Sequence, residues 1–346
     1  MAGPESCRKV IAMNQNTRNR LQKPFVPNSR IVFDIPMGQK MRKGSVILVG
    51  SIVVSAGTTS GTVFSEGGPA ELIQRIRVNA TPASGSRYPG GYIVDAGVRS
   101  LLRYATCQRS GKSFVDQGGS TLGAGAAGTY PIYTGVPLYF ADDVQFSPLI
   151  TALNLNAGNY SSVQVEVWTA ALNACFTGND RVVDYSGLQV QWADDRIDLP
   201  GDTSVIYQES HIVQIGAANS RMLDPAMPQS GAFMSWDIMA EQTAQANLSD
   251  ALLNKVYISG PDIELEKYAE DIRQTDLDDE WYDPSNTNTG MFHLDFTEGV
   301  VQANTINAGT LDIYFDVNNP SGANLDDLNF FTRRLYAPQP ATAAKA

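Results

Sequence analysis

The side chains best suited to chemistry in this sequence are carboxylates, which occur in four clusters. Neighbouring carboxylates can bind a hard cation such as calcium through oxygen, or act as the acid and base of a glycosidase. Adjacent acids in a loop are usually solvated, so we expect no catalytic residue and no cofactor, we assign no metal ligand, and calcium binding stays open. The clusters are Asp142 with Asp143, Asp194 with Asp195, Asp326 with Asp327, and the acids of residues 276–283, which include Asp278, Asp279 and Glu280.

Other motifs for catalysis or nucleotide binding are weak or absent. Gly123, Gly125 and Gly128 match the spacing G-x-G-x-x-G, but prolines in the next segment oppose the helix that this phosphate-binding motif requires. The two histidines, His211 and His293, lie in strand-like segments, where we expect exposed or hydrogen-bonded side chains. No G-x-S-x-G, H-E-x-x-H, Walker A or EF-hand pattern occurs. The sequence therefore predicts a protein that is not an enzyme.

The tryptophans and cysteines are candidates for sugar binding, disulfides and a zinc site. Trp168, Trp192, Trp236 and Trp281 could form a platform that stacks on sugars, but the first three lie in apolar or alternating segments, where packing in a core is the better explanation. The three cysteines are widely spaced and form no C-x-x-C pair, so we expect free thiols instead of a disulfide framework or a zinc site.

Composition and charge narrow the class of protein further. The chain has 346 residues, 43% of them hydrophobic, with 30 glycines and 18 prolines, which is typical of a globular, loop-rich, β-rich protein. It has no apolar run long enough to span a bilayer and no secretory signal, so we expect a soluble protein made in a cytoplasm. The net charge is −11, although residues 1–29 hold five basic residues against Glu5. Contact with anionic lipid or nucleic acid would have to use this basic arm, unless the arm is simply a solvated tail.

Hydrophobic periodicity predicts many short strands. Residues 46–54 form an apolar, β-branched run that suits a strand covered on both faces. Residues 163–167 and 188–192 alternate apolar with polar side chains, the period of strands with one buried face. Many short strands with glycine-rich turns and only two convincing helices favour β-sandwiches or jelly rolls over a parallel α/β sheet.

Three landmarks recur in the same order in the two halves. Residues 72–80 (LIQRIRVNA) resemble residues 252–260 (LLNKVYISG), and both read as strands. Each is followed by a segment with helical spacing, marked by Val94, Val98, Leu101 and Leu102 in the first half and by Leu265, Tyr268, Ala269 and Ile272 in the second. Later, LNAG at 155–158 and INAG at 306–309 each precede an alternating strand. The repetition indicates two copies of one β-rich unit.

The domain boundaries follow from this repetition. The charged segment around Pro200 and Gly201 separates two strand-rich regions. We predict a basic arm at 1–29, a first jelly roll at 30–195, a linker at 196–204, a second jelly roll at 205–336 and a flexible tail at 337–346. The predicted fold class is all-β with a few short helices, built as two tandem eight-stranded jelly-roll barrels.

This pattern resembles the double jelly-roll major capsid proteins of icosahedral viruses with an internal membrane, of the tectivirus and corticovirus type. The residues that carry the resemblance are KGSVILVGSIVV at 43–54, AELIQRIRVNA at 70–80 with the helix near VRSLLRY, and the segment from INAG to LYAP at 306–338. The second copy has a much shorter connection before its helix, so the two halves are not interchangeable.

The resemblance implies a structural protein of the virion, assembled in the host cytoplasm. It implies a homotrimer whose six barrels form a pseudo-hexagonal capsomer that contacts neighbouring capsomers and other capsid proteins around an internal membrane. It implies no sequence-specific binding of nucleic acid. The arm would face the membrane or a neighbour, and the residues expected to make that contact are Arg8, Lys9, Arg18, Arg20 and Lys23.

Two alternatives stay open at this point. Tryptophans and acidic loops would also suit a tandem β-sandwich that binds carbohydrate or a receptor, with Trp281 as the best stacking residue. A glycoside hydrolase would use two of the loop carboxylates, for which Asp278, Asp279 and Glu280 are the candidates.

Overall fold

The structure is a computed structural model of the chain, and it describes fifteen ranges of residues. No helix among them is both long and apolar enough to cross a membrane. The described ranges are 17–55, 63–64, 68–107, 127–141, 151–171, 176–177, 183–198, 201–223, 231–242, 247–260, 263–278, 290–296, 306–307, 311–320 and 326–336.

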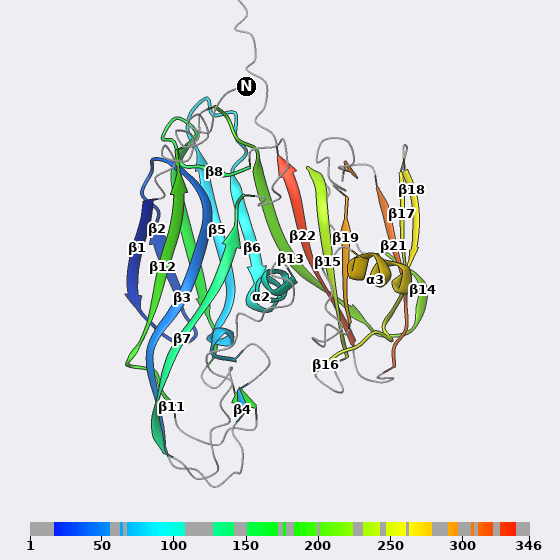
Figure 1. Ribbon diagram of the computed structural model, residues 1–346, viewed down its shortest axis with the longest axis horizontal. Coiled ribbons are helices and arrows are strands. Elements are labelled where there is room, and N and C mark those ends of the chain that lie inside the picture. The colour runs from blue at the N-terminus through cyan, green and yellow to red at the C-terminus, as the bar shows by residue number, and fades with distance from the viewer. Residues whose placement is uncertain are drawn as a thin grey trace, which may run out of the picture.

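Eight strands of the first half form two facing four-stranded sheets (Figure 1). One sheet has the strand order β1-β12-β3-β7 and the other has the order β2-β9-β5-β6. The strands are β1 (Thr17–Pro24), β2 (Arg30–Asp34), β3 (Lys40–Val54), β5 (Ile73–Pro82), β6 (Gly91–Gly97), β7 (Gly128–Tyr139), β9 (Tyr160–Thr169) and β12 (Leu188–Ile197).

Eight strands of the second half repeat the same pairing. Their two sheets have the orders β13-β22-β15-β19 and β14-β21-β17-β18, which match the first barrel strand for strand in chain order. Each half is therefore a jelly roll, and the predicted double jelly-roll fold is confirmed. The strands are β13 (Val205–Ile215), β14 (Asn219–Leu223), β15 (Ala232–Gln242), β17 (Leu253–Gly260), β18 (Ile263–Tyr268), β19 (Met291–Asp295), β21 (Asp312–Val317) and β22 (Asp326–Tyr336).

Shorter elements complete the two barrels. A ten-residue helix follows the same strand in each half: α2 (Val98–Cys107) follows β6, and α3 (Ala269–Asp278) follows β18. The remaining elements are the 3₁₀ turn η1 (Gly68–Leu72) and the two-residue strands β4 (Val63–Phe64), β8 (Leu153–Asn154), β10 (Phe176–Thr177), β11 (Val183–Asp184), β16 (Asn247–Leu248) and β20 (Ile306–Asn307).

Alternating side chains fix which face of each strand enters the core. In β12, Leu188, Val190 and Trp192 are fully buried, as their spacing predicts. The Trp192 ring lies directly over Gly44 of the neighbouring strand β3, where an added Cβ would come within 2.1 Å of the ring. Glycine is therefore required at position 44 because the indole occupies the space of a side chain.

Two features of the strands differ from the sequence prediction. Val94 lies in β6, and Leu265 and Tyr268 lie in β18, so each segment expected to be helical begins with a strand and becomes helical only at its second half. Strand β3 is buried on one face only, and Val53 on its other face is 45% exposed. The β-branched run of residues 46–54 therefore packs against a single core.

The two barrels share a sheet at their junction. Strand β13 of the second barrel pairs antiparallel with β22 and parallel with β6 of the first barrel, where Gln208 lies opposite Val94. His211, three residues further along β13, lies opposite Phe330. Successive strand residues point to opposite faces, so Val94 of the first core and Phe330 of the second core lie on opposite faces of the shared sheet. The barrels stand side by side, each closed by its own outer sheet (Figure 1).

Candidate assembly interface

The acidic clusters do not assemble into a catalytic or metal site in the described part of the chain. Asp194 and Asp326 are buried within strands β12 and β22, so they are not solvated loop residues as the sequence suggested. Asp278 is the last residue of α3, whereas Asp142, Asp143, Asp279 and Glu280 lie outside the described residues. No group of three or more His, Cys, Asp and Glu side chains in the described ranges is arranged to hold a metal ion.

Asp194 instead forms a buried network inside the first barrel. Its carboxylate accepts hydrogen bonds from Arg196 Nε at 2.8 Å, from Arg196 Nη2 at 3.1 Å and from the Trp192 indole at 3.0 Å. Arg196 also donates to the carbonyl oxygen of Pro36 at 2.7 Å. The side chains of Asp194 and Arg196 are 0% and 5% exposed. This network ties the end of β12 to the turn after β2, so its role is structural.

The histidines and tryptophans also have structural roles where the structure describes them. His293 is buried and its Nδ1 lies 2.9 Å from Asp237 Oδ1, in line with the prediction of an exposed or hydrogen-bonded side chain. His211 stacks on Phe330, a contact that the sequence did not predict. Trp192 and Trp236 are fully buried, which confirms core packing for both. Trp168 is half-buried and Trp281 lies outside the described residues, as do Gly123 and Gly125; Gly128 is the first residue of β7.

Helix α2 lies between the two barrels and contacts both. Leu101 and Leu102 face the first core, while Tyr104 packs its ring 5.1 Å from the ring of Phe331 in the second barrel. The guanidinium of Arg333 lies 5.1 Å above the Tyr104 ring. Met239, Met291 and Phe331, on the outer face of the second barrel, are consequently part of the first core instead of facing solvent.

Polar contacts orient this helix. Arg103 donates to Glu241 Oε1 at 2.5 Å, and the Ser100 hydroxyl donates to Asn329 Oδ1 at 3.1 Å. Glu241 lies in an acidic group on the second barrel with Asp326 and Asp327. Burial raises the pKa of Asp327 above its ordinary value, and the neighbouring carboxylates of Glu241 and Asp326 raise it further. The basic side chain of α2 therefore meets an acidic surface.

A cleft of ≈ 1040 Å³ opens where β6 and β13 diverge, and its cations are already paired. Arg75 and Arg77 both donate to Asp95. Partial burial alone would raise the pKa of Asp95, but these two hydrogen bonds outweigh it and hold the pKa below its ordinary value. The guanidinium of Arg77 also lies 5.6 Å above the Trp168 ring. Because these charges are satisfied internally, the cleft is a poor candidate for an anion site.

Three of the five basic residues assigned to the arm, Arg18, Arg20 and Lys23, lie in the described part of the chain. Residues 17–24, which the sequence analysis assigned to the arm, form β1, the first strand of the first barrel. Leu21 of this edge strand packs against the first core, but Arg20 and Gln22 beside it in the sequence are polar, so hydrophobic alternation could not reveal the strand. Arg18 and Arg20 lie on β1, whereas Lys23 turns onto the barrel, donating to the carbonyl oxygen of Val32 at 2.5 Å. Arg8 and Lys9 lie outside the described residues.

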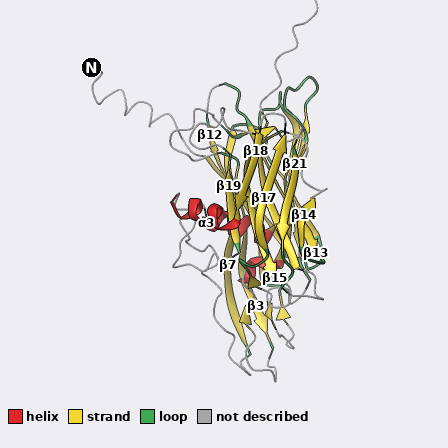
Figure 2. Ribbon diagram, turned by 90° about the vertical axis from the view of Figure 1, so that its right-hand side faces the viewer, coloured by secondary structure: helices red, strands yellow, loops and turns green. Residues whose placement is uncertain are grey.

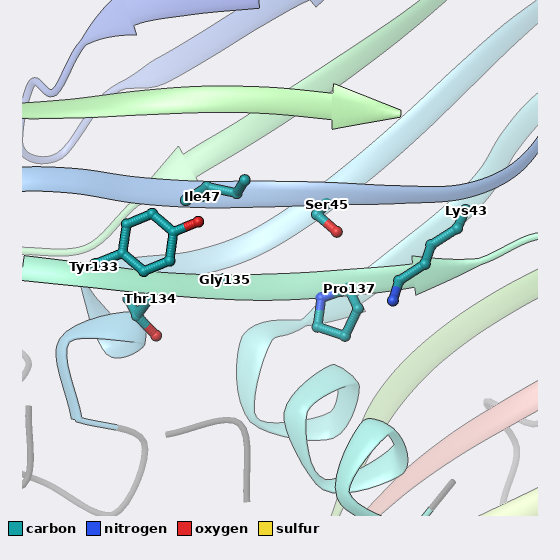
Figure 3. A pocket seen from close by; sticks show the side chains of 7 residues that line it. All are labelled: Lys43, Ser45, Ile47, Tyr133, Thr134, Gly135 and Pro137. Carbon is teal, nitrogen blue, oxygen red and sulfur yellow. The ribbon is translucent and has the colours of Figure 1, made fainter. Parts of the chain in front are cut away.

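The outer face of the β1-β12-β3-β7 sheet carries a shallow pocket of ≈ 220 Å³. Figure 3 shows its lining: Ile47 and Tyr133 lie side by side on β3 and β7, with Lys43 and Pro137 at the other end. Tyr133 is 55% exposed. In the second barrel the residues at the corresponding place, Met239 and Met291, are buried in the first core. This face of the first barrel is therefore more exposed than its counterpart in the second.

Sequence reasoning missed the residues of the inter-barrel contact. Arg99 and Arg103 are four residues apart, which places both on one side of a helix. Tyr104, beside Arg103, adds an aromatic ring to the same helix. A basic and aromatic stripe on a short helix in a β-rich chain was the available signal for a docking helix.

Comparisons with known proteins support the fold. No protein-family model matches the chain, and no curated protein is similar to it in sequence. Solved structures do match over nearly the whole chain. The atomic structure of Sulfolobus turreted icosahedral virus gives a TM-score of 0.66 at 12% identity, covering 94% of this chain and 91% of that chain. The major capsid protein P2 from bacteriophage PM2 gives 0.57 at 10% identity, covering 93% and 98%. The Faustovirus major capsid protein gives 0.58 at 9% identity, covering 93% and 90%.

Proposed function

We propose that this double jelly-roll protein is a viral major capsid protein that self-associates as a homotrimer. The observation that carries the proposal is the duplication: two barrels of identical strand order stand side by side and share a sheet. Three such chains supply six like barrels, which suit a capsomer with a pseudo-hexagonal outline. The similarity to two viral major capsid proteins and to a chain in the structure of an icosahedral virus supports the same role.

A capsid role implies that the trimers assemble with other proteins of the virion. Trimers tile with neighbouring capsomers and other capsid proteins into an icosahedral shell around an internal membrane, in a virion assembled in the host cytoplasm. The described residues hold no metal-binding cluster, and several of their charged side chains are paired across neighbouring strands, such as Arg75 and Arg77 with Asp95 and Arg334 with Glu209. This pattern suits a building block better than an enzyme.

The oligomeric state tests the proposal directly. Size-exclusion chromatography with light scattering at micromolar concentration is expected to give a mass three times that of the 37.4 kDa chain. A monomer under these conditions would remove the proposed function, because capsid subunits need large permanent interfaces of about 2,000 Å² or more.

We further propose that Arg8 and Lys9 contact anionic lipid of the internal membrane. Deletion of residues 1–16 leaves β1 intact and is expected to weaken binding to anionic vesicles at low salt by about 30-fold for each chain whose arm contacts the membrane, at about 1 kcal/mol for each of its two cations. The loss should shrink at high salt, where charges are screened. Vesicle co-sedimentation measures both.

The matched control for this deletion is the full-length Arg8→Gln, Lys9→Gln variant, which removes the charges and keeps the chain. It should lose as much vesicle binding as the deletion and remain trimeric. Equal vesicle binding by all three proteins would show that the segment does not contact lipid.

A further inference from the structure

Strand β13 is only partly covered along the edge that faces the first barrel. On one side it pairs with β22 over its whole length. On the other side, within the described ranges, it pairs with β6 at Gln208 and Glu209 alone. Beyond this point the two strands diverge, because β6 ends at Gly97 and the chain turns into α2 (Figure 1). The last part of β13, residues 210–215, therefore has an open edge.

The backbone groups at this edge point into the cleft between the barrels. The carbonyl oxygen of Ser210 accepts a hydrogen bond from Arg75 of the first barrel at 3.4 Å, whereas that of Glu209 accepts one from a β22 hydroxyl at 3.4 Å. Backbone groups of successive strand residues face opposite edges. Ile212 and Gln214 therefore direct their N–H and C=O groups to the open edge, where no strand of the described chain pairs with them.

An exposed aliphatic side chain lies on the same edge. Ile212 is 60% exposed and lines the cleft of ≈ 1040 Å³, together with Val98 and Ser100 from the first turn of α2. A single exposed aliphatic side chain needs no explanation by itself. Beside unpaired backbone groups it is the side chain that an added strand would cover, and native proteins usually protect such edges.

The other walls of the cleft are polar but electrically balanced. Arg75 and Arg77 both donate to Asp95, and Arg99 makes two hydrogen bonds with Glu71, at 2.9 and 3.2 Å. A charged ligand would have to compete with these internal pairs. The cleft is therefore suited to an uncharged ligand.

The backbone edge, and not the aromatic side chain, is the feature that can recognise such a ligand. The guanidinium groups of Arg30 and Arg77 lie 5.9 and 5.6 Å from the Trp168 ring, so cations already stack on this indole and a sugar ring would have to displace them. The N–H and C=O groups of a strand edge match the groups of another extended polypeptide. A sugar or a lipid has no such repeat.

The shape of the cleft favours one free segment over the edge of a folded barrel. The Gly97 N–H donates to the Ser210 hydroxyl at 2.8 Å and closes the end of the cleft at which β6 and β13 still pair. A strand that belongs to a barrel would bring its neighbouring strands into this wedge. Figure 2 shows β13 at the right of the second barrel and α3 at its left, so α3 does not cover the open edge.

We propose that this cleft binds an extended, uncharged segment of a different protein, which adds a strand to the open edge of β13. The segment takes the place that β6 leaves, exchanges hydrogen bonds with Ile212 and Gln214, and covers the Ile212 side chain with an apolar side chain of its own. In this mode backbone hydrogen bonds give affinity and the alternate side chains give specificity. The proposed site goes beyond the capsid role and does not require the trimer.

A backbone variant tests the edge. The probe is a fluorescein-labelled peptide selected from a displayed library of random peptides, and fluorescence anisotropy measures its binding to the full-length protein. Gln214→Pro removes the N–H that faces the cleft and leaves the pairing with β22 intact, so it should fold and bind the peptide about tenfold more weakly or worse. The matched control Gln214→Ala keeps the N–H and should bind like the wild type.

A side-chain variant tests the same edge without changing the backbone. Ile212→Lys removes the apolar contact and should weaken peptide binding by about tenfold or more. Its circular dichroism spectrum should not change, because Ile212 is exposed. The matched control is Val53→Lys at an exposed valine of β3, outside the cleft, and it should bind the peptide like the wild type.

Hydrogen exchange at single-residue resolution tests the binding mode. The bound peptide should slow exchange of the Ile212 and Gln214 amides and leave the Val213 amide, which faces β22, unchanged. The proposal would be overturned if no peptide were selected, if Ile212→Lys bound the peptide as well as the wild type, or if neutral oligosaccharides bound at this cleft instead. Light scattering of the same samples reports the trimer separately, so each proposal can fail without the other.

Discussion

Replacing Tyr104 by alanine is expected to lower the free energy of unfolding by about 3–5 kcal/mol, the cost of truncating a buried aromatic side chain. Tyr104 is 1% exposed and its ring contacts both barrels: it lies 6.2 Å from Tyr139 of the first and 5.1 Å from Phe331 of the second. The substitution also removes the ring beneath the guanidinium of Arg333. A urea titration followed by tryptophan fluorescence measures the loss.

The conservative variant separates packing from the hydroxyl group. Tyr104→Phe keeps the ring and its contacts, so it should cost no more than about 1.5 kcal/mol. Similar unfolding midpoints for Tyr104→Ala and the wild type would show that α2 does not hold the barrels together. A loss as large in Tyr104→Phe as in Tyr104→Ala would assign the effect to the hydroxyl.

Asp194→Ala is the second substitution with a large expected effect, about 3–5 kcal/mol of unfolding free energy, because it leaves a buried cation without its counter-charge. Arg196 would lose both hydrogen bonds to the carboxylate, and the Trp192 indole would lose its acceptor. The side chain of Arg196 is only 5% exposed, so water cannot replace the lost partner without opening the barrel.

A second variant makes this prediction specific to the buried charge. Asp194→Ala combined with Arg196→Met removes both charges and keeps an unbranched apolar stem, so it should recover part of the stability lost in the single variant. Thermal unfolding of the three proteins compares them. If the double variant is less stable than Asp194→Ala, the cost arises from packing and from the Pro36 contact of Arg196 instead of from an isolated charge.

Much of the fold could be predicted because burial imposes a period of two on a strand. The alternation of Val163, Val165 and Val167 correctly placed β9. The repeat of residues 72–80 at 252–260 correctly identified β5 and β17 as equivalent strands of the two barrels. The duplication itself was visible because equivalent core positions need similar apolar side chains in both barrels.

Other features could not be predicted because tertiary contacts decide them. Val94 and Val98 are four residues apart, a spacing that favours a helix, yet Val94 lies in β6, where pairing with β5 and β13 overrides the local pattern. Strand β1 has few apolar side chains and is defined by its partner β12. Asp194 reads as a loop acid beside Asp195, and only the folded barrel places Arg196 and Trp192 around it.

Negative-stain electron microscopy of the purified full-length protein tests the central claim most directly. Class averages viewed down the symmetry axis are expected to show three-fold symmetric particles with a hexagonal outline, because three chains contribute six barrels of like fold. Particles of a single pair of barrels, or two-fold symmetric dimers, would contradict the account.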